Sequence, residues 1–317
     1  AWDWLDAARY ADSNGYQGDG ERTMWPWRDW VVQAFNRNLP YDQFTVWQLA
    51  GDLLPEATFE QRLATGFCRN HMINGEGGRI AEENRVDYVM DMAETTGTVW
   101  LGLTLNCCRC HDHKFDPLTR RDYYGLFAFF NQTPVDGGGG DPQTPPVIEV
   151  PSDEQKQRLT ALEAAVAAAT QELDSWERTR FPRPEGQTAD QSEAAAQVPD
   201  NVRAIFKLPA AGRNRNQLAE LEKHWEKEGP EYVQHVSRLR TAIDNRDALR
   251  GSIPRVMVMA DRPEPRQTFL LDKGLYDKPG EAVSAAVPAK LPPLPAGAPP
   301  NRLGLAQWLV SPAQPLA

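Results

Sequence analysis

The chain has 317 residues, of which 41% are hydrophobic and 25% charged. These values are close to the averages of globular proteins and exclude a disordered or collagen-like chain. The net charge is −10, and no run approaches the roughly 18 apolar residues of a membrane helix, so we expect neither a nucleic-acid partner nor a membrane span.

Aromatic and apolar residues recur at helical spacing throughout residues 1–135. From Val86 to Trp100 the apolar positions are three or four residues apart, which is the pattern of one buried helix face. A last amphipathic stretch, 118–130, ends in a group of aromatic side chains. The sequence therefore predicts a helical domain over residues 1–135.

The pattern changes after residue 135. Four consecutive glycines at 137–140, followed by several prolines, predict a linker over residues 136–151. Apolar residues from Leu159 to Trp176 then follow a heptad pattern, and a second apolar stripe runs from Leu218 to Ile243. Two such stripes joined by a loop predict an antiparallel helical hairpin over residues 152–250.

The last segment, 251–317, has a different composition. Short runs at 256–259 and 267–271 are typical of β-strands, and many prolines follow them before a helical pattern at 303–310. We expect an extended, β-containing segment and the start of a following domain. The predicted fold class is thus mainly α, and the abrupt ends lead us to expect part of a longer polypeptide.

Three of the four cysteines lie within four positions, in the sequence Cys107-Cys108-Arg109-Cys110-His111. Cys107, Cys110 and His111 form the C-x-x-C-H pattern of a c-type haem attachment site. Two thiols at this spacing can reach the two vinyl groups of a porphyrin, and the adjacent histidine can bind the iron. We therefore expect one covalent haem c per chain. Such haems are attached outside the cytoplasm, so we expect a periplasmic or extracellular protein.

Two other uses of these residues remain open. Cys107, Cys110, His111 and His113 could bind zinc, although ligands this crowded would strain a tetrahedral site. The two thiols of the C-x-x-C pattern could instead form a redox pair. Cys68 and Cys108 are expected to take no part in either arrangement.

A haem iron has a second axial position, and we expect His71 to be either its ligand or a residue of the distal pocket. His113 is too close to His111 to cross to the opposite ring face, so we expect it to hydrogen-bond a propionate or nearby backbone. Basic side chains could pair with the propionates, since guanidinium groups match carboxylates. The candidates are Arg69, Arg79, Arg109 and Lys114, and the other candidate axial ligands are Met72, Met90 and Met92. Glu83, Asp87 and Asp91 share a helical face, which we interpret as solvated charge.

Several segments resemble one known family. They are Ala8-Arg9-Tyr10-Ala11-Asp12-Ser13-Asn14-Gly15-Tyr16, Gln48-Leu49-Ala50-Gly51-Asp52-Leu53-Leu54-Pro55, Thr95–Thr104, and Cys107–Pro117 with its Cys-His-Asp-His-Lys-Phe-Asp-Pro ending. Together they resemble the large planctomycete-type secreted proteins with cytochrome-c-associated domains of unknown function. The resemblance covers residues 1–135, and 302–312 is similar to the start of the companion domain in that family. It implies an exported haem protein but supplies no reaction.

We therefore expect electron transfer within a larger exported assembly. The partners would be other redox or cytochrome subunits, or the remaining domains of a longer polypeptide. One alternative is a haem enzyme in extracytoplasmic polysaccharide or small-molecule metabolism. Another is a structural module that bound zinc or haem stabilises. Whether the protein is an enzyme stays open at this point.

Overall fold

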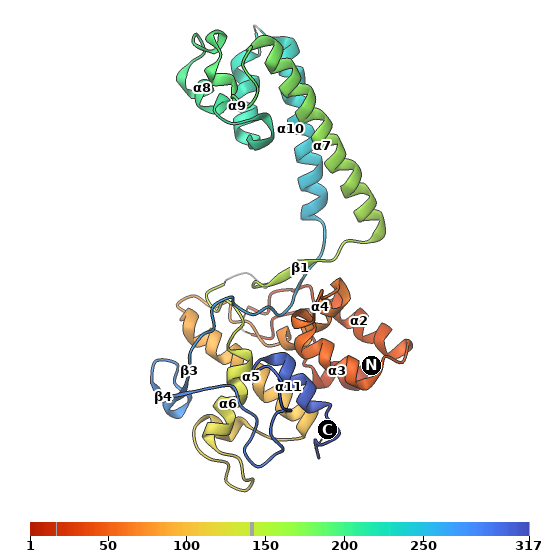
Figure 1. The fold of residues 1–317 in the computed structure, drawn as a ribbon, viewed down its shortest axis with the longest axis vertical. Coiled ribbons are helices and arrows are strands. Elements are labelled where there is room, and N and C mark those ends of the chain that lie inside the picture. Colours follow the sequence, from red (N-terminus) through yellow and green to blue (C-terminus); the bar gives the residue numbers. More distant parts are fainter. Residues whose placement is uncertain (17, 140–142, 228, 317) are drawn as a thin grey trace. The chain divides into compact units, whose positions relative to one another are not determined.

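The computed structural model describes residues 1–16, 18–139, 143–227 and 229–316. The fold is mainly helical, as the sequence predicts, with two small two-stranded antiparallel sheets among the described residues (Figure 1). The chain forms two compact units, one from residues 1–150 and 255–317 and the other from residues 151–254. No helix within the described ranges is both long and apolar enough to span a bilayer.

The first unit contains most of the helices. They are α1 (Trp2–Ala7), α2 (Trp25–Asn36), α3 (Tyr41–Ala50), α4 (Phe59–Ala64), α5 (Ala81–Leu101), α6 (Arg120–Phe130) and α11 (Arg302–Leu309). Helix α5 packs against α6, and its apolar face is buried, as at Val89 and Ala93. A capping box formed by Thr119 and Asp122 fixes the start of α6, because each residue bonds the backbone of the other.

The C-terminal segment belongs to the same core as the N-terminal helices. Leu305 and Trp308 of α11 are buried in the same hydrophobic cluster as Trp27 and Phe129, and α11 packs against α3. Arg302, at the start of α11, donates to the backbone oxygen of Leu49 at 2.8 Å. Residues 302–309 therefore complete the core that residues 1–135 begin.

Two short antiparallel sheets of two strands each accompany these helices. Strands β1 (Val147–Glu149) and β2 (Arg255–Met257) are antiparallel, with Glu149 opposite Arg255. Strands β3 (Thr268–Leu271) and β4 (Pro279–Val283) form the other pair. The buried guanidinium of Arg69 donates to the backbone oxygen of Val258 at 2.9 Å. Val258 directly follows β2, so this bond helps to fix the first sheet in place.

The predicted linker, 136–151, is only partly described, because Gly140, Asp141 and Pro142 lie outside the described residues. Gly137 rests directly on α5, where an added Cβ would lie 2.1 Å from the Ala81 oxygen. Only a residue without a side chain fits this close approach. Asn84 of α5 donates to the Gly137 oxygen at 3.0 Å, so this glycine is held against the helix.

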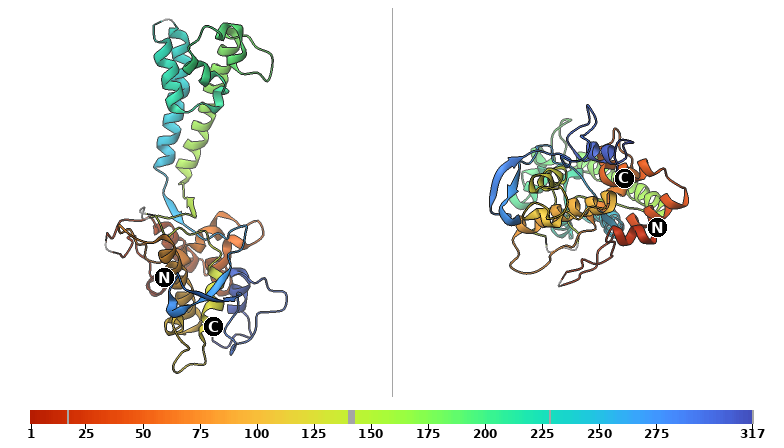
Figure 2. Two further views of the ribbon diagram at one scale, coloured as in Figure 1. Left: turned by 90° about the vertical axis from the view of Figure 1, so that its left-hand side faces the viewer. Right: turned by 90° about the horizontal axis from the view of Figure 1, so that it is seen from below.

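Helices are the regular elements of the second unit among its described residues, and loops connect them. It contains α7 (Asp153–Arg180), α8 (Asp200–Phe206), α9 (Arg215–Trp225) and α10 (Pro230–Gly251). Helices α7 and α10 run side by side as a long antiparallel pair, and α9 also packs on α10 (Figure 2). Leu173 of α7 and Val236 of α10 are buried between them. The capping box of Ser152 and Gln155 starts α7, at the spacing seen in the sequence.

Candidate functional site

The segment that carries the C-x-x-C-H pattern forms a tight turn after α5. Gly102 ends α5 with φ +63°, and a short 3₁₀ helix follows at Asn106–Arg109. The amides of Cys110 and His111 both donate to the Cys107 oxygen, at 3.2 and 3.3 Å. These bonds close the turn around its first cysteine.

The three cysteines of the turn differ in their exposure to solvent. Cys107 and Cys110 are exposed, whereas Cys108 is fully buried and its thiol lies 3.7 Å from the Leu118 oxygen. Burial raises the pKa of the Cys108 thiol, which keeps it protonated and unreactive. Only the two thiols at C-x-x-C spacing are therefore presented to a reagent or cofactor.

Helix α5 holds this turn through two of its carboxylates. Arg109 donates to Asp87 at 2.5 Å, and Asn106 donates to Glu94 at 2.7 Å. Glu94 also accepts from the Tyr123 hydroxyl at 2.7 Å. Burial raises the pKa of Glu94, whereas the hydrogen bond from Tyr123 and the positive charge of Arg109 lower it by a smaller amount. Both ends of the 3₁₀ helix are thus fixed to one face of α5.

His111 is exposed, and its ring is oriented by the next peptide. Its Nδ1 lies 2.7 Å from the Asp112 oxygen. A carbonyl oxygen can only accept, so Nδ1 carries the hydrogen of this bond and the lone pair of the neutral ring is on Nε2. The Asp112 carboxylate in turn accepts from the Arg120 amide at 2.8 Å. His111 therefore presents Nε2 as a possible metal ligand.

His113 has a different environment. Its Nδ1 accepts from the Asp116 amide at 2.8 Å and from the Phe115 amide at 3.3 Å, so Nδ1 carries no hydrogen. This bonding stabilises the loop after His111. The neighbouring Lys114 has its ammonium 5.0 Å from the centre of the exposed Phe115 ring.

His71 lies in the interior of the same unit and is 1% exposed. Its ring stacks on Tyr88 of α5 with the centroids 4.5 Å apart, and its Nδ1 lies 2.9 Å from the Met72 oxygen. Its Nε2 is buried and has no hydrogen-bond partner among the residues that the structure describes. Burial, reinforced by the charge of Arg69, lowers the pKa of His71 well below its usual value. The ring is therefore neutral, with a free lone pair on Nε2.

A cavity of about 250 Å³ lies beside His71. Its wall also includes Tyr88, Asp87 and Glu94 of α5, together with Arg109 from the C-x-x-C-H turn. The buried His71 and Arg109, one of the two residues between Cys107 and Cys110, thus line the same cavity. Cys107, Cys110 and His111 themselves do not line it.

Three acidic residues of α5, which the sequence analysis interpreted as solvated charge, have different surroundings in the structure. Glu83 is exposed, as solvated charge requires, but Asp87 and Asp91 line the cavity. Asp91 pairs with Arg9 at 2.5 Å. The sequence reasoning missed Glu94, although positions 87, 91 and 94 have the spacing of one helical face.

Two basic candidates from the sequence are occupied elsewhere. Arg69 is fully buried and donates to the backbone oxygens of Thr144 and Val258, so its expected pairing with a propionate is wrong. Arg79 donates to the oxygens of Gly138 and Glu76. Arg109, which pairs with Asp87, and Lys114 lie in or next to the C-x-x-C-H turn.

The residues present fit the donor chemistry of a c-type haem. The two exposed thiols and the Nε2 of exposed His111 are the groups that such an attachment would use. By contrast, no set of three or more His, Cys, Asp or Glu side chains among the described residues is arranged to bind a metal ion.

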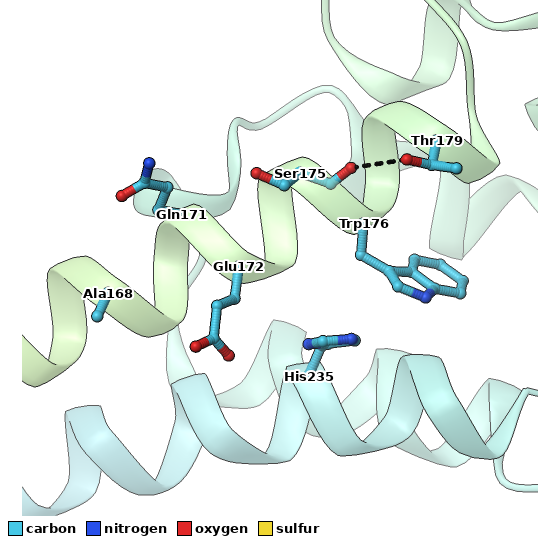
Figure 3. A pocket seen from close by; sticks show the side chains of 7 residues that line it. All are labelled: Ala168, Gln171, Glu172, Ser175, Trp176, Thr179 and His235. Atoms are coloured by element: carbon cyan, nitrogen blue, oxygen red, sulfur yellow. Dashed lines mark hydrogen bonds between the residues drawn. The ribbon is translucent and has the colours of Figure 1, made fainter.

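A second cavity, of about 550 Å³, lies on the α7–α10 pair. Figure 3 shows its lining residues, with Trp176 and Glu172 of α7 directed toward His235 of α10. The rings of Trp176 and His235 are 6.1 Å apart. Glu172 and His235 are the titratable side chains among its described lining residues.

The region that contains the turn matches a known family model. Residues 1–135 match the PSCyt2 family model, described as a protein of unknown function (DUF1549). The PSCyt2 match includes helices α1–α6, His71 and the C-x-x-C-H turn, and its description states no activity. No curated protein and no solved structure matches the chain.

Proposed function

We propose that the protein carries one covalent c-type haem on Cys107 and Cys110, with His111 as an iron ligand. The observation that supports this proposal is the exposure of the turn: both thiols of the C-x-x-C pattern are accessible, and the intervening Cys108 is buried. His111 also has the bonding of a metal-ligating histidine, because such residues usually donate their second ring nitrogen to a carbonyl or carboxylate.

Attachment requires no redox co-reactant. Each thiol adds across one vinyl double bond, so that sulfur bonds to one carbon and the thiol hydrogen goes to the other. The chain's own residues then orient the site: Asp87 and Glu94 fix the turn, and Asp112 supplies the backbone oxygen that orients His111. Arg109 and Lys114 are the basic groups near enough in sequence to pair with propionates.

The function that we infer is electron transfer in an exported assembly. A haem supplies one-electron chemistry, with a potential set by its axial ligands and surroundings. Because c-type attachment takes place outside the cytoplasm, the proposal includes a periplasmic or extracellular location. The partners would be other redox subunits or further domains of the same polypeptide.

The proposal is tested by producing the chain in the periplasm of a host that has a c-type maturation system. We expect an absorption band of haem and an intact mass increased by one haem that survives denaturation. Cys107→Ala and Cys110→Ala should each weaken or abolish covalent retention. The matched control is Cys68→Ala, because Cys68 is buried away from the turn and should leave haem content unchanged.

Thiol titration provides an independent measurement. Haem-loaded protein should show no fast-reacting thiol when folded and two after unfolding, from Cys68 and Cys108. Haem-free protein should show two fast-reacting thiols, from Cys107 and Cys110. Purified protein with neither the absorption band nor the added mass would overturn the proposal.

A further inference from the structure

Two arginines of the first unit line a cavity to which the C-x-x-C-H turn does not contribute. The cavity has a volume of about 630 Å³, within the range of roughly 300–1,000 Å³ that is typical of small-molecule sites. Arg262 and Arg266 line it from the loop that precedes β3. The C-terminal end of α6, the end of β4 and the residues just before α11 supply most of the remaining wall.

Arg266 is held in place by the backbone around it. Its Nη1 donates to the backbone oxygens of Asn131 and Thr133, at 3.1 and 3.4 Å. The side chain of Gln132 accepts from the Arg266 amide at 2.7 Å and donates to the Arg266 oxygen at 3.1 Å. The guanidinium is therefore fixed before a ligand arrives, which lowers the entropic cost of binding one.

The positive charge of Arg266 is not balanced by an acidic side chain. Burial and the nearby charges of Arg85 and Arg262 lower the pKa of Arg266 to about 10, so it stays charged at neutral pH. Glu82 opposes this shift, but its ion pair is with Arg85, at 2.7 Å. In the part of the chain that the structure describes, neither Arg262 nor Arg266 has a carboxylate as an ion-pair partner. A bound anion would supply the missing counter-charge.

The acidic side chain in the cavity wall, Asp261, is already paired. Its carboxylate accepts from Nη2 and Nε of the buried Arg302, at 2.8 and 3.1 Å. Asn301, also in the wall, accepts from the Leu303 amide through Oδ1, which leaves its side-chain nitrogen as a donor. Ser284 adds a hydroxyl. The wall therefore offers donors and positive charge, which suit an anion.

We propose that this cavity binds a small organic anion, whose carboxylate or phosphate group is held by Arg262 and Arg266. Guanidinium groups bind both of these groups through charge-assisted hydrogen bonds. The cavity is larger than an inorganic ion requires, and Val283, Ala285 and Pro300 offer apolar contacts to an organic body. The site needs no haem, so it adds a binding function and does not rest on the proposed one.

Isothermal titration calorimetry of the purified full chain tests this proposal, with benzoate and phenyl phosphate as the probes. We expect saturable binding of at least one of them, with one probe per chain, and the tighter probe identifies the preferred acidic group. Benzyl alcohol has the same ring without the charge. It should bind about tenfold more weakly or less, because it forms no charge-assisted hydrogen bond.

Two substitutions locate the binding site. Arg262→Gln and Arg266→Gln should each weaken binding of the anion by about tenfold, since each removes a charged donor. Arg62→Gln is the matched control, because it removes an exposed arginine of α4 that does not line the cavity. This control should leave the affinity unchanged.

The proposal would be overturned if neither anion binds saturably, or if benzyl alcohol binds as tightly as the anions. Unchanged affinity in both Arg262→Gln and Arg266→Gln, or an equal loss in Arg62→Gln, would also overturn it. If Arg266→Gln does not fold, because its bonds to Asn131 and Thr133 are lost, Arg262→Gln decides the question. The Arg262 side chain makes no hydrogen bond to the described residues, so its removal should leave the fold intact.

Discussion

The carboxylate of Asp87 on α5 lies 2.5 Å from the guanidinium of Arg109 in the C-x-x-C-H turn. The two side chains are 46% and 38% exposed, so the pair contributes only about 0.2–1 kcal/mol to global stability. Its main effect is local, because Arg109 lies between Cys107 and Cys110. Asp87→Ala should therefore loosen the turn without unfolding the protein.

Hydrogen exchange measures this loosening. In haem-free protein, the amides of Cys110 and His111 should exchange about two- to fivefold faster in Asp87→Ala, which corresponds to the loss of an exposed ion pair. Asp200→Ala removes an exposed pair with Arg203 in the other unit and should leave these amides unchanged. Unchanged exchange in Asp87→Ala would show that two other contacts hold the turn by themselves. They are the bond from Asn106 to Glu94 and the bond from the Tyr124 hydroxyl to the Arg109 oxygen, at 3.0 Å.

Glu94 gives a prediction about pH. Its pKa is raised in the folded protein, mainly by burial, so the folded state binds its proton more tightly than the unfolded state does. The contribution of Glu94 to stability therefore falls as pH rises from about 4.5 through the folded pKa. Urea unfolding of haem-free protein should show that Glu94→Gln gains stability relative to the unaltered chain as pH rises.

The exposed residue Glu83 on the same helix is the control for that measurement. Glu83→Gln shows what the removal of an exposed carboxylate from this helix does by itself. The raised pKa of Glu94 would be contradicted if the difference in unfolding free energy between Glu94→Gln and the unaltered chain stays constant between pH 4.5 and 7.

Arg302 should be the most sensitive charged residue of the first unit. It is fully buried and donates to Asp52 at 2.6 Å and to Asp261 at 2.8 Å. Arg302→Leu would leave two poorly exposed carboxylates without a counterion, at a cost of about 3–5 kcal/mol. Denaturant unfolding should show this loss. Arg121→Leu breaks the exposed pair with Glu281 and should cost less than about 1 kcal/mol.

The second unit should be removable. Its hydrophobic cluster shares no residue with that of the first unit, and Glu149 pairs directly with Arg255 where the chain leaves and returns. Replacing residues 150–254 by Asn-Gly would join β1 and β2 through a two-residue hairpin turn. We expect the first unit to unfold cooperatively within a few degrees of the unaltered chain.

Circular dichroism of a peptide spanning 151–254 completes this experiment. The buried bond from the Tyr232 hydroxyl to Glu177, at 2.8 Å, and the packing of Leu173 lie wholly within that peptide, so we expect it to be helical and to melt cooperatively. An aggregated or non-cooperative shortened chain would show that the two units depend on each other for folding.

The helices were largely predictable because their signals are local. The apolar periodicity of Val86–Trp100 lies within α5, and the heptad stripe of Leu159–Trp176 lies within α7. Burial of one helix face imposes a spacing of three and four residues on the sequence itself. The separate strands β1 and β2 were less predictable, since their partners are more than 100 positions apart.

For the candidate site, the sequence alone supplied the C-x-x-C-H chemistry, because the spacing of Cys107, Cys110 and His111 is a local property of the chain. Only the tertiary structure showed that Cys108 is buried, that Asp87 and Glu94 hold the turn, and that His71 has an unsatisfied nitrogen in a cavity shared with Arg109. The exposure of a side chain, its ion pairs and the hydrogen bonds of its polar atoms all depend on segments that are distant in the chain. They are decided when α5 packs against the loops that contain His71 and Arg109, and no periodicity in the sequence encodes them.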